Sequence, residues 1–131
     1  MGSNNKIVVI YKSKYGSTKK YAEWIAKSVN GELLENKNIK GEALDKYDTI
    51  VYGGGLYAGG IAGVKLIKNN INKLKGKKVI VFAVGTAPEK EEHIEHFMKH
   101  NFDEEMKEKL NIFFFYFIIN STIAVIFFLS V

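Results

Sequence analysis

The stretch KIVVIYKSKYGST, residues 6–18, decides the fold because it joins a buried strand to the start of a helix. Its first half is a run of β-branched and aromatic residues, typical of a strand buried on both faces of a parallel sheet. From Ser17 onward apolar residues recur at three- and four-residue spacing, which predicts a helix with Ser17 or Thr18 as N-cap and Gly31 as stop. A strand that leads directly into a helix is the repeating unit of an α/β sheet.

The rest of the chain continues this alternation of strands and helices. Apolar runs predict further strands at residues 32–34, 48–52, 78–84 and 111–117. Helical spacing predicts further helices at residues 64–74, 89–100 and 103–109. Together they predict an α/β fold with a doubly wound, parallel, five-stranded sheet.

The composition excludes several classes of function. With no cysteine among its 131 residues, the chain has no disulfide framework, no thiolate metal site and no cysteine nucleophile, and it suits a reducing cytoplasm. All 19 basic residues are lysines, so no guanidinium group can read guanine edges in DNA. The lysines are scattered over helix faces and loops, so we expect no nucleic-acid partner.

The loop after the first strand carries the features of a phosphate site. In a doubly wound sheet, ligands bind beyond the carboxyl ends of the strands. This loop leads into a helix N-terminus, whose free N–H groups and dipole favour an anion, and it carries hydroxyls on Ser13, Ser17 and Thr18. On spacing alone, a nest for a phosphate monoester and an ordinary N-cap loop both remain open.

Two other phosphate motifs do not fit. A P-loop needs Lys and then Ser or Thr after its last glycine, whereas Gly59 is followed by a glycine and an isoleucine. Gly53, Gly55 and Ala58 match the dinucleotide fingerprint, but no acidic residue stands about 20 positions further on. Six of the 12 glycines nevertheless lie within residues 53–63, where the backbone must turn sharply or approach something closely.

Three segments resemble the flavin loops of flavodoxins. Residues 11–18, with the helix that follows, are similar to the FMN phosphate loop and first helix of that family. Residues 47–59 resemble a second flavin loop, in which a Tyr-x-Gly element lies beside the ring, and residues 84–88 resemble the third. The similarity is greatest to the branch that includes menaquinone-dependent protoporphyrinogen dehydrogenase, and it covers residues 5–117.

The resemblance implies that FMN is the cofactor and that these three loops hold it. The phosphate would be bound by Ser13, Lys14, Tyr15, Gly16, Ser17 and Thr18. The ring would lie against Gly54, Gly55, Leu56, Tyr57, Ala58 and Gly59, with Tyr57 stacked on or beside it. Its other side would be bordered by Gly85, Thr86, Ala87 and Pro88. Because the flavin carries the redox chemistry, no catalytic side chain is required.

These features predict a cytoplasmic flavoprotein of electron transport. It would exchange electrons with a redox partner protein, a quinone or a small-molecule substrate, either as a carrier or as an oxidoreductase of the protoporphyrinogen dehydrogenase type. The loops around Tyr57 are apolar and neutral, whereas acids typically ring the flavin edge of a carrier, and this favours an enzyme. The alternative is a flavodoxin-shaped binding or regulatory module without a working cofactor.

The three histidines raise the separate hypothesis of a metal site. His93, His96 and His100 fall within one face of the helix predicted at residues 89–100, and the last two have the spacing of a two-histidine metal pair. No cysteine and no third ligand from another element accompanies them. We therefore expect a solvated helix face and no metal.

The C-terminal part of the chain departs from the family. From Leu110 onward, 22 residues carry no charge. The family usually continues into a final amphipathic helix that closes one face of the sheet, whereas here that helix is missing or replaced by an apolar tail. We therefore divide the chain into a flavodoxin-like FMN-binding domain, residues 1–117, and an atypical apolar tail, residues 118–131.

Three interpretations of the tail remain open. In the first, residues 112–131 form a membrane anchor, because these 20 residues have the length of a membrane span, although the polar residues 120–122 interrupt them. In the second interpretation it substitutes for the missing helix or packs against a second subunit in a homodimer. In the third it is translated out of frame, because residues 113–115 are all Phe and imply a run of thymines in the gene.

Overall fold

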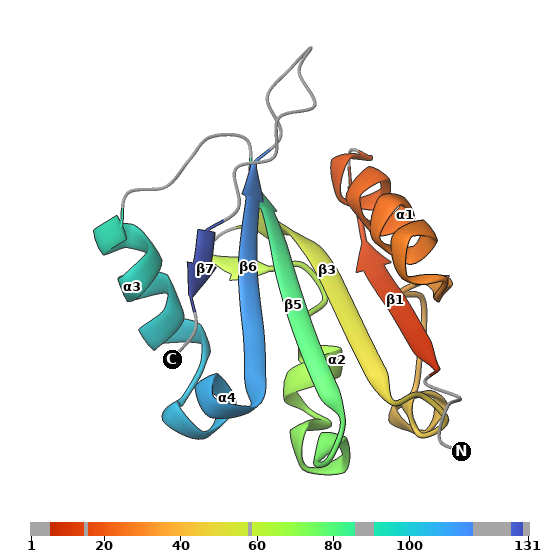
Figure 1. Ribbon diagram of the computed structural model, residues 1–131. Helices are drawn as coiled ribbons and strands as arrows, with labels where there is room; N and C mark the ends of the chain where they lie inside the picture. The colour runs from red at the N-terminus through yellow and green to blue at the C-terminus, as the bar shows by residue number, and fades with distance from the viewer. Residues whose placement is uncertain (1–5, 15, 58, 86–90, 117–126, 130–131) are drawn as a thin grey trace.

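A twisted sheet forms the centre of the molecule, with helices on both of its faces (Figure 1). The computed structural model describes residues 6–14, 16–57, 59–85, 91–116 and 127–129. Five strands run parallel: β1 (Ile7–Lys12), β2 (Glu32–Glu35), β3 (Thr49–Tyr57), β5 (Lys78–Gly85) and β6 (Leu110–Tyr116). Two short strands are antiparallel, β4 (Gly60–Ile61) against β3 and β7 (Phe127–Leu129) against β6.

The strands lie in the order β2-β1-β3-β5-β6-β7, so the chain reverses its direction across the sheet after β2. This order confirms the predicted doubly wound sheet of five parallel strands. In this class of fold, ligands bind at the carboxyl ends of the strands where the order reverses, which here are those of β1 and β3. There Lys12 pairs with Gly54, and Gly55 in turn pairs with Val84. The carboxyl ends of β1, β3 and β5, where the three predicted cofactor segments begin, therefore meet at one edge.

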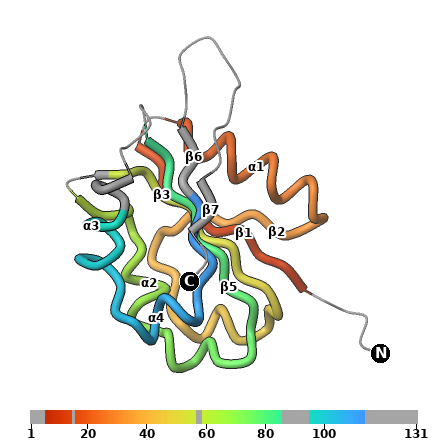
Figure 2. The backbone as a smooth tube through the Cα atoms, turned by 60° about the vertical axis from the view of Figure 1, so that its left-hand side comes forward, coloured from red at the N-terminus to blue at the C-terminus, as the bar shows by residue number. Residues whose placement is uncertain are grey.

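The helices divide unequally between the two faces of the sheet. One face carries α1 (Ser17–Val29), and the other carries α2 (Lys65–Lys68), α3 (Glu91–Asn101) and α4 (Glu104–Lys109) (Figure 2). Two short 3₁₀ helices complete the fold, η1 (Gly41–Leu44) and η2 (Ile71–Leu74). Asp103 caps α4, because its side chain accepts a hydrogen bond from the Met106 N–H at 2.8 Å.

The central strands are buried on both faces, as the apolar run in residues 7–11 predicts. Val8, Val9 and Ile10 of β1 are completely buried. Val8 and Ile10 belong to the core on the side of α2, α3 and α4, whereas Val9 packs in a smaller cluster with Ala22 of α1. The alternation of neighbouring residues between two cores explains why the strand reads as continuously apolar.

The glycine-rich segment differs from its prediction. We expected the third strand to end at Tyr52 and a loop to follow, but β3 continues to Tyr57 and then pairs back with β4. Two of its glycines serve close packing. A Cβ at Gly53 would lie 2.0 Å from the Phe82 ring, and a Cβ at Gly54 would lie 2.4 Å from the Ala62 carbonyl oxygen. These glycines therefore allow a close approach within a strand rather than a turn.

The helix predicted over residues 64–74 is also wrong as one continuous helix. It is broken into α2 and η2, with Asn70 between them at a non-helical φ of −114°. The Asn70 side chain donates to the Leu66 carbonyl oxygen at 2.7 Å, a contact by which asparagine competes with helical hydrogen bonding. Ile67 and Leu74 are still buried, so the apolar pattern marked the core-facing side of two shorter elements.

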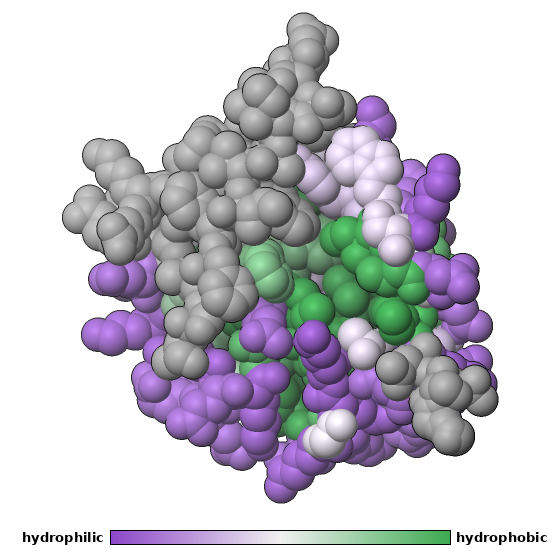
Figure 3. Space-filling view, viewed as in Figure 1, coloured by the Kyte–Doolittle hydropathy of each residue, from purple (hydrophilic) through white to green (hydrophobic). Residues whose placement is uncertain are grey.

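The described residues leave the sheet face beside α1 partly uncovered. An apolar groove of about 360 Å³ opens there, toward the amino ends of the strands. Its apolar lining includes Ile25, Val29, Val51, Ile80, Phe82 and Phe113. Figure 3 shows apolar side chains gathered on this face of the molecule.

The tail returns to the sheet as a strand. Phe127–Leu129 form β7, which runs antiparallel to β6 and extends the sheet at that edge. Within the residues that the structure describes, none after Lys109 is helical, and no helix is long and apolar enough to cross a membrane. Residues 117–126 and 130–131 lie outside the described residues, so the three interpretations of the tail stay predictions.

Replacing Gly53 with Ala should lower the free energy of unfolding by about 1–3 kcal/mol, because the new methyl group would overlap the buried Phe82 ring. Gly55→Ala is the matched control in the same strand, since its Cβ would lie 3.8 Å from the nearest atom, the Thr18 Oγ1. Removing a glycine from the strand there should leave stability unchanged or raise it by about 0.5–1 kcal/mol. Urea unfolding of both variants measures the difference, and equal stabilities would contradict the close packing of β3 on Phe82.

Candidate functional site

A hydrogen bond between Gly16 and Ser13 closes the loop after β1. The Gly16 N–H donates to the Ser13 Oγ at 3.0 Å, and Gly16 has a φ of 93°, a left-handed conformation that favours glycine. Gly16 is the N-cap of α1, which corrects the expectation that Ser17 or Thr18 would cap the helix. Both residues lie instead in the first helical turn.

The N-terminus of α1 has no side-chain cap. The first helical hydrogen bond runs from the Lys20 N–H to the Gly16 carbonyl oxygen, so the N–H groups of the preceding turn have no partner within the helix. Thr18 is only 4% exposed, and its hydroxyl has no hydrogen-bond partner among the described residues. A buried hydroxyl beside uncapped N–H groups is the environment that an anionic group would satisfy.

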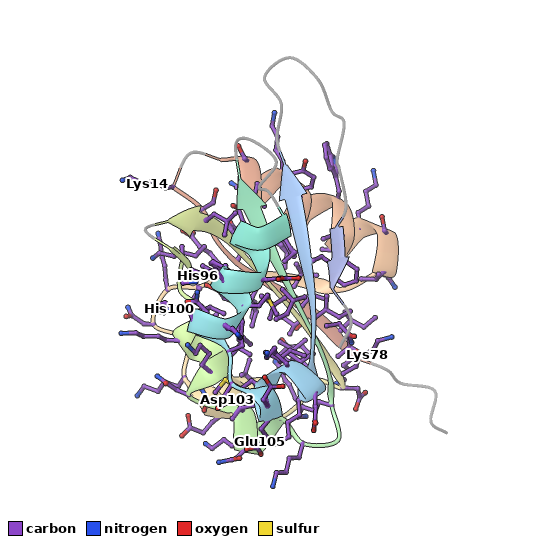
Figure 4. All side chains as sticks on the ribbon, turned by 90° about the vertical axis from the view of Figure 1, so that its left-hand side faces the viewer. Lys14, Lys78, His96, His100, Asp103 and Glu105 are labelled. Carbon is purple, nitrogen blue, oxygen red and sulfur yellow. The ribbon has the colours of Figure 1, made fainter. Side chains whose placement is uncertain are left out.

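The charge around this loop favours the same kind of ligand. Residues 6–22 contain five lysines and no acidic residue. Lys14 is exposed and extends outward from the loop (Figure 4). Because an exposed ammonium is screened by salt, these lysines would attract an anion without holding it in a defined position. The backbone and the hydroxyl groups are therefore the candidates for specific contacts.

The second loop is the hairpin formed by β3 and β4. Leu56 pairs with Ile61 and Tyr57 pairs with Gly60. Gly55 faces the first loop, because a Cβ built on it would lie 3.8 Å from the Thr18 Oγ1. The fold therefore brings the second predicted cofactor segment against the buried hydroxyl of the first.

The tip of this hairpin is held by α3. The Asn101 Nδ2 donates to the Gly59 carbonyl oxygen at 2.8 Å and to the Phe97 carbonyl oxygen at 2.9 Å. Gly59 has a φ of 78°, which explains the need for glycine at this turn. Asn101 was absent from the predicted site because nothing in the local pattern ties it to a residue so far away in the chain.

The base of the hairpin is held by Tyr52 and Asn36, which the sequence analysis also missed. The Tyr52 hydroxyl donates to the Ala62 carbonyl oxygen at 2.7 Å. The Asn36 Nδ2 donates to the Tyr52 hydroxyl oxygen at 3.1 Å and to the Gly63 carbonyl oxygen at 3.3 Å. Tyr52 was predicted only as a strand residue, and its aromatic ring does lie in the core.

The third predicted loop is described only at its start. Gly85 ends β5 and pairs with Tyr116 of β6. Tyr15, Ala58, Thr86, Ala87 and Pro88 lie outside the described residues. For Tyr57 the structure describes the backbone pairing alone. The roles assigned to these residues stay predictions.

His96 and His100 lie away from the loops, on the outer side of α3 (Figure 4). The rings of His96 and His100 stack with their centroids 6.0 Å apart. Among the residues that the structure describes, no group of three or more acidic, histidine or cysteine side chains could hold a metal ion. A metal at this helix would therefore have only the two histidines as described ligands.

Strand order and the uncapped loop-to-helix junction define a doubly wound α/β domain with a candidate anion site where the strand order reverses. The model of the flavodoxin domain family matches residues 8–116. This match covers most of the chain, and the protein therefore belongs to the flavodoxin domain family.

One relative is an uncharacterized protein of Methanocaldococcus jannaschii, 28% identical over 108 residues that make up 80% of this chain. The chain spans 65% of the length of that relative.

Solved structures share the fold. Oxidised flavodoxin 2 from Bacillus cereus is 21% identical with a TM-score of 0.53, over 83% of this chain and 84% of that one. A flavoprotein from Lactobacillus acidophilus in complex with FMN is 20% identical with a TM-score of 0.51, over 84% and 91%. A flavodoxin, WrbA-like protein from Agrobacterium tumefaciens is 19% identical with a TM-score of 0.55, over 82% of each chain. At these identities the similarity is one of fold.

The two hydrogen-bonded tyrosines should make stability fall at high pH. Burial raises the pKa of Tyr52 to about 12, against the hydrogen bond from Asn36, which acts to lower it. Burial, and then the hydrogen bond to Glu32, raise the pKa of Tyr47 to about 12. Because a tyrosine in the unfolded chain has a pKa of about 10, this stability is complete below pH of about 10 and is lost as the pH rises toward about 12.

Urea unfolding of the wild type and of Tyr52→Phe and Tyr47→Phe at a series of pH values measures this dependence. Each phenylalanine variant should show a shallower decline above pH of about 10 than the wild type, because one titrating group has been removed. A decline of equal slope in all three proteins would contradict the shifted pKa values.

Proposed function

We propose that this protein binds FMN at the carboxyl edge of the sheet and works as a redox flavoprotein. The observation that carries the proposal is the buried Thr18 hydroxyl, which has no partner among the described residues and lies beside the uncapped N-terminus of α1. A phosphate monoester would accept hydrogen bonds from that hydroxyl and from the N–H groups of the first helical turn. This mode of binding needs no arginine, in agreement with the composition.

Each loop has a distinct role in this proposal. Residues 13–18 would hold the phosphate, with Ser13 maintaining the shape of the loop through Gly16. The backbone of residues 54–59 would face the flavin ring, and residues 85–88 would border its other side. Bound FMN would supply the transfer of one or two electrons, while the chain sets its affinity and its environment.

The comparisons support the cofactor. The Lactobacillus acidophilus flavoprotein shares this fold and was solved in complex with FMN, and the Bacillus cereus neighbour is an oxidised flavodoxin. The chain itself belongs to the flavodoxin domain family. Since the identities are low, the local features of the α1 junction carry more of the argument than the overall similarity does.

We further propose an oxidoreductase of the protoporphyrinogen dehydrogenase type rather than a carrier. No acidic residue occurs anywhere in residues 49–88, which include the second loop and most of the third. A protein carrier that docks a cationic partner needs acids around its flavin, whereas a quinone or another uncharged small molecule does not. Contact with a membrane or a second subunit through the apolar tail would suit such a substrate.

Binding of FMN tests the first proposal. The wild type should bind FMN much more tightly than riboflavin, which lacks the phosphate. Ser17→Ala and Thr18→Ala should each lose about 1.5–3 kcal/mol of binding to a charged acceptor, which corresponds to about ten-fold or more in Kd. Gly16→Val should weaken binding further, because its φ of 93° disfavours a β-branched residue. Quenching of flavin fluorescence measures all these affinities.

Two variants serve as controls for that experiment. Ser28→Ala removes a hydroxyl from the opposite end of α1, where it donates to the Trp24 carbonyl oxygen, and should leave the affinity for FMN unchanged. Lys14→Ala removes an exposed charge and should weaken binding only slightly, and less at higher salt. Equal affinities for FMN and riboflavin would overturn the phosphate site. A protein that binds neither would favour the binding or regulatory module.

The finer proposal needs an assay of its own. FMN-loaded protein supplied with protoporphyrinogen and menaquinone should oxidise the porphyrinogen faster than the same mixture without protein. The double variant Ser17→Ala with Thr18→Ala is the matched control, because it should lose activity in proportion to its loss of FMN. A rate at the uncatalysed background with fully loaded wild type would leave an electron carrier.

A further inference from the structure

The Tyr52 hydroxyl is the meeting point of three segments that are far apart in the sequence. It donates to the Ala62 carbonyl oxygen, just after β4, and accepts from the Asn36 side chain, just after β2. The backbone around it leaves little room for movement, since a Cβ at Gly63 would lie 2.1 Å from this hydroxyl oxygen. The hydroxyl is therefore enclosed by the chain as well as hydrogen-bonded to it.

Asn36 connects this point to the phosphate loop. Its backbone N–H donates to the Tyr11 carbonyl oxygen at 2.7 Å, and Tyr11 lies in β1 directly before the segment that leads to Ser13. Its side chain reaches the opposite way, to the Tyr52 hydroxyl and to the Gly63 carbonyl oxygen. One residue thus contacts both the end of β1 and the base of the β3–β4 hairpin.

Ala62 carries the connection into the hairpin itself. Its N–H donates to the Gly55 carbonyl oxygen at 2.9 Å, while its carbonyl accepts from Tyr52. Both the N–H and the carbonyl group of Ala62 are therefore hydrogen-bonded. Gly55 is in turn the residue that faces the buried Thr18 hydroxyl. The hydrogen bonds made by Tyr52 thus link Ala62 and the hairpin to Gly55, which also pairs with Val84 of β5.

We infer that Tyr52 and Asn36 are a positioning pair that holds the hairpin of residues 54–61 at a defined distance from the phosphate loop. The inference rests on the FMN site proposed above. Neither side chain has to touch the cofactor, because the pair acts through the Ala62 and Gly63 carbonyl groups. A ring that lies against a loosened hairpin would bind less tightly and would meet altered hydrogen bonds, which change its redox potential.

Tyr52→Phe tests the pair because it keeps the aromatic ring and removes only the hydroxyl. Tyr47→Phe is the matched control, since Tyr47 is also buried and its hydroxyl also makes a hydrogen bond, to Glu32, away from the hairpin. We expect Tyr52→Phe to raise the Kd for FMN by about five-fold or more and Tyr47→Phe to leave it within about two-fold. The midpoint potential and the visible spectrum of bound FMN should change only in Tyr52→Phe.

Asn36→Ala should reproduce the loss, and the double variant should lose less than the sum of the two single changes, because both act through one network. A loss of folding stability alone would not move the potential or the spectrum of the remaining bound flavin. If Tyr52→Phe and Tyr47→Phe bind FMN with equal affinity and equal potential, the inference is overturned.

Hydrogen exchange of the Ala62 amide separates this inference from the proposed function. In protein without FMN, exchange at Ala62 should be faster in Tyr52→Phe than in the wild type and unchanged in Tyr47→Phe, because the bond from Ala62 to Gly55 is loosened. Failure of the wild type to bind FMN would overturn the proposed function. The exchange rates would then decide by themselves whether the pair positions the hairpin, and equal rates in all three proteins would refute it.

Discussion

The parallel pairing of β1 with β2 on one side and with β3 on the other is the constraint on which the rest of the structure depends. Because β1 is buried on both faces, its backbone N–H and carbonyl groups must form their hydrogen bonds with neighbouring strands. The chain leaves β1 at its carboxyl end, where the loop to α1 begins. The register then sets Lys12 beside Gly54. The junction with α1 and the β3–β4 hairpin meet there as a consequence of strand pairing.

A site at such an edge is built mainly from backbone. Three glycines of β3 bring its backbone close to other groups. Gly53 lies against the Phe82 ring, Gly54 against the Ala62 carbonyl group and Gly55 near the Thr18 hydroxyl. Larger residues at Gly53 or Gly54 would push these neighbours apart, whereas a Cβ at Gly55 would make an ordinary contact. The ligand groups that remain are N–H groups and hydroxyls, which suit a phosphate ester and require no arginine. The composition of the chain and the chemistry of the site are therefore consistent.

The two faces of the sheet are covered by different elements. The face under α2, α3 and α4 encloses a core that includes Tyr52 and Phe102. On the other face α1 is the one helix among the described residues, and an apolar groove lies beside it. β7 extends the sheet beside β6, and this pairing satisfies backbone groups at an edge that would otherwise be open. β7 therefore extends the sheet at its edge, while the apolar groove lies on the α1 face.

The sequence by itself determined the class of fold and the position of the first loop. Short-range patterns carry that information: the apolar run of residues 7–11 and the helical spacing after Ser17 each reflect burial of neighbouring residues. Only the tertiary structure decided where β3 ends, why the helix predicted over residues 64–74 breaks, and how Asn36 meets Tyr52. The end of β3 and the contact of Asn36 with Tyr52 depend on segments that meet only once the sheet has formed. The break of the helix depends on the hydrogen bond from the Asn70 side chain to the Leu66 carbonyl oxygen, which the apolar pattern does not record.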